Sequence, residues 1–193
     1  MFGMSPILLI ALVLAIVLIL WAVFTYNRLV KEHLRVDEAW STVDIQIKRR
    51  ASLVPNLVET VAGYATHERE TLEQVTRARR QLEAAEGAKA AAAANSLLDH
   101  ALGRLLAVVE RYPDLKASAG FLSLQAELSD LETKIASSRQ FYNRCVLEYN
   151  TRVGSLPSSL IASAANFEPR SFFELGGTAE EPRVRFTAGE HKP

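Results

Sequence analysis

The sequence predicts an all-α protein with a single N-terminal transmembrane helix, an elongated antiparallel three-helix bundle and a short C-terminal helix. Three observations lead to this prediction. No charged residue occurs in residues 1–27, apolar residues recur at intervals of three and four through most of residues 36–153, and glycine and proline are frequent toward the end of the chain. Intervals of three and four are the repeat of one face of an α-helix. We therefore expect residues 1–27 to form the N-terminus and membrane helix, 28–175 the bundle, and 176–193 a disordered tail.

The first element is the uninterrupted apolar segment of residues 6–24, PILLIALVLAIVLILWAVF. Its length suits a hydrocarbon core about 30 Å thick. A buried core helix is an alternative, but it would need surrounding helices that this chain hardly supplies. A cleaved signal peptide would need a basic start, a shorter apolar run and small residues at the cleavage site. Trp21 and Tyr26 fit an interfacial aromatic belt. We therefore expect an uncleaved anchor.

Basic residues follow the apolar segment, and none precedes it: Arg28, Lys31 and Arg35. By the positive-inside rule, this distribution places the N-terminus outside and the rest of the chain in the cytoplasm. The three residues are spaced by three and four, so they lie on one helix face from which they can reach lipid headgroups.

Small residues within the apolar segment form a candidate contact face between two membrane helices. Ala11, Ala15 and Ala22 lie on one side of a helix that is otherwise built from large aliphatic residues. Small residues allow two helix backbones to approach closely in lipid. The alternative is that alanine is simply common in membrane helices, and no Gly-x-x-x-Gly pair is present. The pattern predicts a homo-oligomer through this face.

The first bundle helix is predicted over residues 36–86, with its apolar row at Val36, Trp40, Val43, Ile47, Ala51, Val54, Val58, Val61, Ala65, Leu72, Val75 and Leu82. Pro55 lies inside this row. Either two elements meet there or one helix is bent. The row keeps its phase through Pro55, which favours a kinked but continuous helix, although the missing amide and the steric clash cost about 3 kcal/mol. Gly87 favours a helix end near Glu86–Gly87.

The remaining helices are read from the same spacing. An alanine-rich helix over residues 88–110 carries Leu98, Ala101, Leu105 and Val109 on one face. A long helix from Pro113–Asp114 to Val153–Gly154 carries Phe121, Leu124, Leu128, Leu131, Ile135, Ser138, Tyr142, Cys145, Tyr149 and Arg152. A short helix follows at PSSLIASAANF. Burying all three long stripes requires an up-down-up bundle with short turns.

The residues offer little catalytic chemistry. The 22 basic and 22 acidic side chains balance, so the overall charge gives no argument for nucleic acid binding. No histidine has an acidic residue three positions before it, which a di-iron bundle requires, and the sequence THERE lacks the second histidine of a zinc HExxH motif. Cys145 lies on the apolar row and is expected to be a core residue rather than a nucleophile. We predict no catalytic residue, no metal ligand and no cofactor.

Polar residues within the predicted helices are the remaining candidates for a site: Arg49, Asn56, Glu132, Arg139, Asn143 and Asn150. One interpretation is a polar network across the bundle that sets the register of the helices. The other is a conduit or a surface that binds a partner. The first is the simpler interpretation, because polar residues on facing helices commonly pair.

Four segments in fixed order resemble the LemA family: YNRLV (26–30), AWSTVDIQIKRRASLVPNLVETVAGYATHE (39–68), RYPDLKASAGFLSLQAEL (111–128) and SRQFYNRCVLEYNTRVGSLPSSLIA (138–162). The resemblance covers about residues 26–175. It implies a bacterial single-pass protein of the cytoplasmic (inner) membrane with a helical bundle and no established enzymatic activity. Leu156 departs from the pattern, which has phenylalanine there.

Three hypotheses for function follow. The first is a non-enzymatic, membrane-anchored scaffold that binds an unidentified protein partner, or a second copy of itself, through the bundle surface. The second is an adaptor that organises membrane lipids through Arg28, Lys31 and Arg35. The third is a hydrolase or metalloenzyme with an unrecognised site.

Overall fold

The structure is a computed structural model that describes residues 6–174 of the chain. These residues form six helices and no strand: α1 (Pro6–Ala62), α2 (Arg69–Glu83), α3 (Gly87–Val109), α4 (Pro113–Lys116), α5 (Ala119–Gly154) and α6 (Ser158–Ala164). The predicted all-helical fold with one long apolar N-terminal helix is thus confirmed. The predicted tail, residues 176–193, lies outside the described residues.

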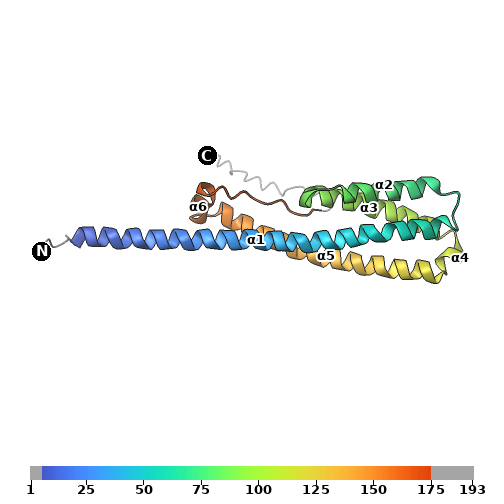
Figure 1. Cartoon of the computed structure of the whole chain (residues 1–193), viewed down its shortest axis with the longest axis horizontal. Helices are drawn as coiled ribbons and strands as arrows, with labels where there is room; N and C mark the ends of the chain where they lie inside the picture. The colour runs from blue at the N-terminus through green and yellow to red at the C-terminus, as the bar shows by residue number, and fades with distance from the viewer. Residues whose placement is uncertain (1–5, 175–193) are drawn as a thin grey trace, which may run out of the picture.

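The molecule is an elongated rod built around α1, whose first part extends alone beyond the other helices (Figure 1). α5 lies antiparallel along the remainder of α1. Two cross-helix ion pairs show this direction, because Glu32 pairs with Arg152 near one end of α5 and Arg50 pairs with Glu132 further along it. α2 and α3 pack beside the C-terminal part of α1, and α6 returns toward α1 after the end of α5 (Figure 1).

α1 is a single helix of 57 residues that joins the apolar segment to the bundle. It continues through Pro55 without a break, as the constant phase of the apolar row predicts. Pro55 is exposed, whereas Val54 and Leu57 beside it are fully buried. The proline ring therefore points away from the core, and the local bend that it is expected to cause remains a prediction.

The prediction that one helix extends from residue 36 to residue 86 is wrong, because α1 ends at Ala62 and α2 begins at Arg69. A turn separates them, in which the Ala65 amide donates to the Val61 carbonyl at 2.8 Å. Ala65 is fully buried although it lies in this turn. The row of regularly spaced apolar residues therefore continues through the turn without a gap. The spacing shows which residues are buried, but it does not show where the backbone reverses. Two helices occupy the place of the predicted one.

The other predicted boundaries agree more closely. α3 nearly coincides with the predicted helix over residues 88–110, and α5 ends at Gly154 as expected. The predicted start at Pro113 is instead the short helix α4. α5 begins after Ser118, whose Oγ accepts a hydrogen bond from the Phe121 amide at 3.3 Å. This N-cap satisfies a backbone donor that the new helix leaves free, and it fixes the second start.

Candidate functional site

A buried arginine lies in the middle of the bundle. The Arg50 guanidinium contacts three side chains from α3 and α5: Nη1 lies 2.5 Å from Asp99 Oδ1 and 3.0 Å from Glu132 Oε2, and it donates to Asn95 Oδ1 at 3.3 Å. Asn95 Nδ2 in turn donates to Asp99 Oδ2 at 3.0 Å. Arg50 is only 6% exposed, while both carboxylates reach solvent. The cluster therefore ties α1, α3 and α5 together at one height of the rod.

The sequence prediction missed Arg50 and Asn95 although a signal was present. Arg50 comes three residues after Ile47 and four before Val54, and both of these residues are buried. Asn95 similarly precedes the buried Leu98 by three. A polar residue on an apolar stripe must find a partner on the facing helix, because an unpaired buried charge is costly. Arg49, which the sequence prediction named instead, is exposed.

A second polar arrangement holds residues 165–174, which form a turn at 165–166 and then run without regular secondary structure, against α5. Asn143 and Asn150 each bind one residue of this segment by both backbone groups. Asn150 Nδ2 donates to the Arg170 carbonyl and its Oδ1 accepts from the Arg170 amide, each at 2.8 Å. Asn143 makes the same pair of bonds with Phe173, at 3.1 Å to the carbonyl and 2.8 Å from the amide. We call residues 165–174 the strap.

The spacing of the two asparagines matches the repeat of the strap. Seven residues of α-helix rise about 10.5 Å, and three residues of extended chain span about 10 Å. The tyrosines that precede the two asparagines repeat the pattern, since Tyr142 Oη donates to the Ser171 carbonyl at 2.8 Å and Tyr149 Oη to the Glu168 carbonyl at 3.0 Å. Two Tyr-Asn pairs that are seven residues apart on α5 thus form hydrogen bonds with the backbone of the strap. Burial raises the pKa of both tyrosines, which preserves the hydroxyl protons that these bonds require.

The strap also forms an ion pair with α1. Arg170 Nη2 lies 2.5 Å from Asp37 Oδ1 and 3.1 Å from His33 Nε2. A guanidinium can only donate, so the contact with His33 is a hydrogen bond in the tautomer whose Nε2 carries no proton. Its other nitrogen, Nδ1, lies 3.4 Å from Tyr149 Oη, and the ring packs edge-on against Tyr149 and Phe167. The strap therefore bridges α1 and α5 near the start of the bundle.

The structure does not bring the six predicted polar residues together as one network. Glu132 joins the Arg50 cluster, and Asn143 and Asn150 hold the strap. Arg49 and Asn56 are exposed and Arg139 is half-buried, and the side chains of these three make no hydrogen bond or ion pair with the residues that the structure describes.

The three predicted membrane-flanking residues do share one surface. Arg28, Lys31 and Arg35 line a shallow hollow of about 480 Å³ together with Phe24, Asn27 and Glu32. Part of their charge is offset within the chain, since Arg28 lies 3.3 Å from Glu32 and Arg35 lies 2.9 Å from Glu148.

The predicted alanine face is only partly accessible. Ala11 and Ala15 are exposed, whereas Ala22 is half-buried. Ala11 and the buried Leu29 are separated by about five helical turns, so both lie on the same side of α1. A second copy that docks along Ala11 and Ala15 must therefore accommodate the bundle of the first copy below them. Self-association through this face remains a proposal.

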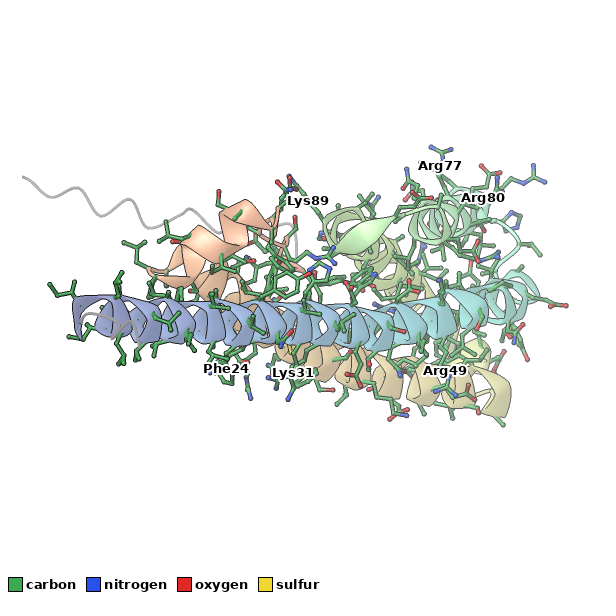
Figure 2. The ribbon with its side chains drawn as sticks, turned by 60° about the vertical axis from the view of Figure 1, so that its left-hand side comes forward. Phe24, Lys31, Arg49, Arg77, Arg80 and Lys89 are labelled. Carbon is green, nitrogen blue, oxygen red and sulfur yellow. The ribbon has the colours of Figure 1, made fainter. Side chains whose placement is uncertain are left out.

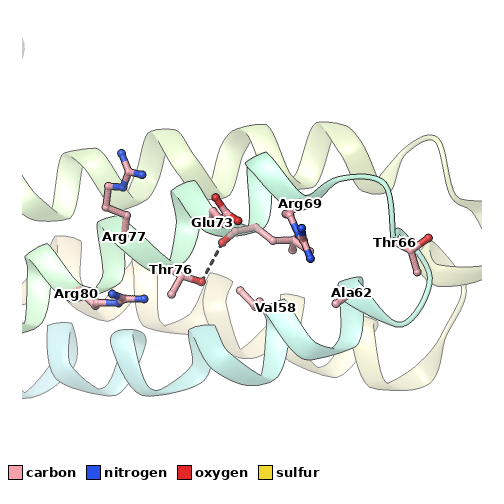
Figure 3. Close-up of a pocket in the computed structure, with 9 residues that line it drawn as sticks. Val58, Ala62, Thr66, Arg69, Glu73, Thr76, Arg77 and Arg80 are labelled. Carbon is pink, nitrogen blue, oxygen red and sulfur yellow. Dashed lines mark hydrogen bonds between the residues drawn. The ribbon is translucent and has the colours of Figure 1, made fainter.

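A basic groove lies between α1 and α2 at the end of the bundle farthest from the apolar segment. It has a volume of about 700 Å³ and is lined by Val58, Ala62, Thr66, Arg69, Leu72, Glu73, Thr76, Arg77 and Arg80 (Figure 3). Apolar side chains from both helices form its floor, and Thr76 Oγ1 donates to the Leu72 carbonyl at 2.9 Å. Arg69, Arg77 and Arg80 form no ion pair with any carboxylate of residues 6–174. The groove therefore offers three guanidinium groups and one carboxylate to an incoming molecule.

The groove and the strap were not predicted as sites. The three arginines of the groove belong to the run RETLEQVTRARR, where their charge was visible in the sequence. They lie beside Val58 and Ala62 only because the chain turns back after α1. The sequence prediction missed this turn.

Within residues 6–174, no group of three or more His, Cys, Asp or Glu side chains is placed to hold a metal ion. Cys145 is buried, and burial raises the pKa of its thiol, so the neutral thiol is favoured over the reactive thiolate.

Comparisons with known proteins show which family the chain resembles. The family model described as LemA family matches residues 39–186, which is more than half of the chain and extends past the predicted end of the resemblance at residue 175. Protein LemA of Metamycoplasma hominis is 26% identical over 149 residues, covering 77% of this chain and 68% of that protein. Magnetosome protein MamQ of Magnetospirillum gryphiswaldense is 24% identical over 185 residues, covering 82% of this chain and 68% of MamQ. Magnetosome protein MamQ 2 of Paramagnetospirillum magneticum gives the same identity and coverage.

Arg50→Ala should destabilise the bundle by about 2–4 kcal/mol, because the substitution removes the only cation from the buried cluster and leaves Asp99 facing Asn95 and Glu132. Arg49→Ala is the matched control. It removes the same side chain from the adjacent exposed position and should change the free energy of unfolding by less than about 0.5 kcal/mol. Denaturant unfolding of the full chain in detergent, followed by circular dichroism, measures both values. Equal effects of the two substitutions would contradict the role assigned to Arg50.

Asn150→Ala should release the strap without unfolding the helices. The substitution removes both hydrogen bonds to Arg170, so amide hydrogen exchange in residues 168–173 should accelerate by about tenfold or more, while exchange in α3 stays unchanged. Asn56→Ala is the control, because it removes an exposed asparagine from α1. Unchanged exchange of the Arg170 amide in Asn150→Ala would show that packing alone holds the strap.

Proposed function

The chain belongs to the LemA family, and from that premise we propose that it is a membrane-anchored, non-enzymatic scaffold that binds a protein partner through its helical bundle. The single observation that carries the proposal is the continuity of α1, which belongs both to the apolar segment and to the bundle. A helix without a break transmits its orientation along its length. The bundle is therefore held as a rigid rod relative to whatever surrounds the apolar segment.

The exposure of the apolar segment supports a membrane as its surrounding. α1 is long and apolar enough to cross one, and the side chains of residues 7–21 are exposed. A core helix would instead be covered by other helices. In water, a continuous sleeve of exposed leucine, isoleucine and valine side chains would be strongly unfavourable, whereas a hydrocarbon core accommodates it. We propose that the segment crosses the cytoplasmic membrane of a bacterium once.

We further propose that the N-terminus lies outside and the bundle in the cytoplasm, on the basis of Arg28, Lys31 and Arg35. A fluorescent reporter that matures only in the cytoplasm, fused after Pro193, should fluoresce, and alkaline phosphatase fused at the same place should be inactive. Moving the basic residues to the other side, by replacing all three with Gln and inserting three lysines before Pro6, should shift the fusions toward the opposite pattern. Active phosphatase on the parent chain would reverse the proposed orientation.

The basic groove is the surface that we propose for the protein partner. Its arginines lie at the far end of the rod, with Arg77 and Arg80 on α2 on one side and Arg49 on another (Figure 2). Three guanidinium groups above an apolar floor suit an acidic, amphipathic segment, because the carboxylates find charge-assisted hydrogen bonds while the apolar side covers Val58 and Leu72. This arrangement supports binding rather than catalysis, since the groove is open and holds Glu73 as its one carboxylate.

A photo-crosslinking amino acid at Thr76, inside the groove, should give a discrete protein adduct in intact cells that the same amino acid at Ser137, on the exposed side of α5, does not give. The adduct should be lost in Arg77→Glu/Arg80→Glu, because the substitutions turn the groove acidic, and kept in Arg49→Glu. Immunoblotting and mass spectrometry of the full-length chain measure the adducts. An adduct that resists the double charge reversal would contradict a partner with acidic chemistry.

The second candidate function is a lipid-organising adaptor that acts through Arg28, Lys31 and Arg35. The observation that favours it is the shared surface that these residues form next to Phe24, where the apolar run ends. Arg28 pairs with Glu32 and Arg35 pairs with Glu148, which weakens the attraction of this surface for anionic lipids. The lipid-organising adaptor is therefore the less favoured candidate.

A further inference from the structure

The corner between α5 and α6 carries two unusually exposed leucines. Leu156 is 78% exposed and Leu160 is 65% exposed. No other large apolar side chain in residues 25–174 is as exposed as either of them. Single exposed leucines are common on protein surfaces, so the exposure of these two matters only if they belong to a larger apolar patch, which would mark a contact with an apolar surface outside the bundle.

The structure fixes where this corner lies along the rod. Leu156 lines a hollow of about 460 Å³ together with Trp21 and Phe24 of α1. These two aromatic residues stand at the end of the apolar segment. Figure 1 shows α6 beside α1 at the start of the bundle, and Figure 2 shows Phe24 on the same stretch of α1. Because α1 is unbroken, Leu156 lies at the height at which the apolar segment ends.

We propose that Leu156 and Leu160 insert into the headgroup–acyl boundary of the membrane that α1 crosses. The inference rests on the proposed membrane crossing and adds a second contact to it. The occupant is a lipid surface, because Leu156 continues the apolar surface of Trp21 and Phe24, and Leu160 follows four residues later in α6. Arg28 and Arg152 line the same hollow as Leu156, and both pair with Glu32, so charged groups that suit the headgroup layer lie next to this leucine.

A second contact has a consequence for the whole rod. A single helix leaving a membrane can tilt in any direction, whereas a helix and an adjacent inserted corner together define a plane. The direction of the bundle is then fixed toward the side on which α6 lies. The basic groove is displaced along α1 from Phe24 by about 50 Å, so a small change in tilt at the membrane would move it by a large distance.

The test uses the full chain in vesicles of a neutral phospholipid, with Cys145→Ala as background and one introduced cysteine that carries a nitroxide. The collision rates with oxygen, which concentrates in the membrane, and with a water-soluble nickel chelate give the depth of each label. Leu156→Cys and Leu160→Cys should show an oxygen-to-nickel ratio at least about threefold above that of Leu147→Cys. Leu147 is a matched control, since it is 57% exposed but lies on α5 about 13 Å farther from the corner. Circular dichroism verifies that each labelled chain is helical.

A further label separates the inference from the proposal on which it rests. Leu14→Cys lies within the apolar segment and should show the highest ratio. If Leu14 reports the membrane while Leu156 and Leu160 match Leu147, the second contact is refuted and the anchor stands. If Leu14 also matches Leu147, the membrane crossing fails, and the inference fails with it. Ratios at Leu156 and Leu160 that persist in high salt support insertion of apolar side chains over electrostatic attraction of the neighbouring arginines.

Discussion

The hydrogen-bonded backbone of α1 is the constraint on which the other features depend. One helix contributes the whole apolar segment and one side of the bundle core, so no hinge separates the two. Pro55 removes one amide from this helix, yet the helix continues, because Val54 and Leu57 on either side of it are buried and hold both turns in place. Tertiary packing thus overrides the local preference of proline. Whatever orients the apolar segment also orients the bundle.

Polar residues on buried stripes set which residues face one another. Apolar stripes alone permit helices to slide by a turn, since one leucine replaces another at little cost. Arg50 does not permit this, because its guanidinium meets Asp99 and Glu132 in one register only. Asn143 and Asn150 play the same part for the strap. Their separation on α5 matches three residues of extended chain, so a shift of one residue would break four hydrogen bonds at once.

These features lie at different positions along the rod, and this separation supports the proposed role as a scaffold. Exposed apolar side chains gather near the apolar segment, at Phe24 and Leu156. The strap and the Arg50 cluster follow further along α1 and hold the bundle in one arrangement. At the far end lie Arg77 and Arg80, whose guanidinium groups form no ion pair within residues 6–174. A rod with apolar side chains at one end and charged side chains at the other is suited to contacting a membrane and a protein partner at once. Its rigid middle keeps the two at a fixed distance.

The sequence by itself determined the helical fold class, the apolar segment, the continuity through Pro55 and the family, because all of these depend on residue order along one chain. It also indicated the limits of α3 and the end of α5 through local composition. The turn after Ala62 was decided by tertiary structure, since Ala65 is buried in a turn and looks, in the sequence, like one more position of a helix. The partners of Arg50 and of Asn143 were decided in the same way. Each lies tens of residues away, and no periodic pattern says which distant residue will face a given position once the helices have packed.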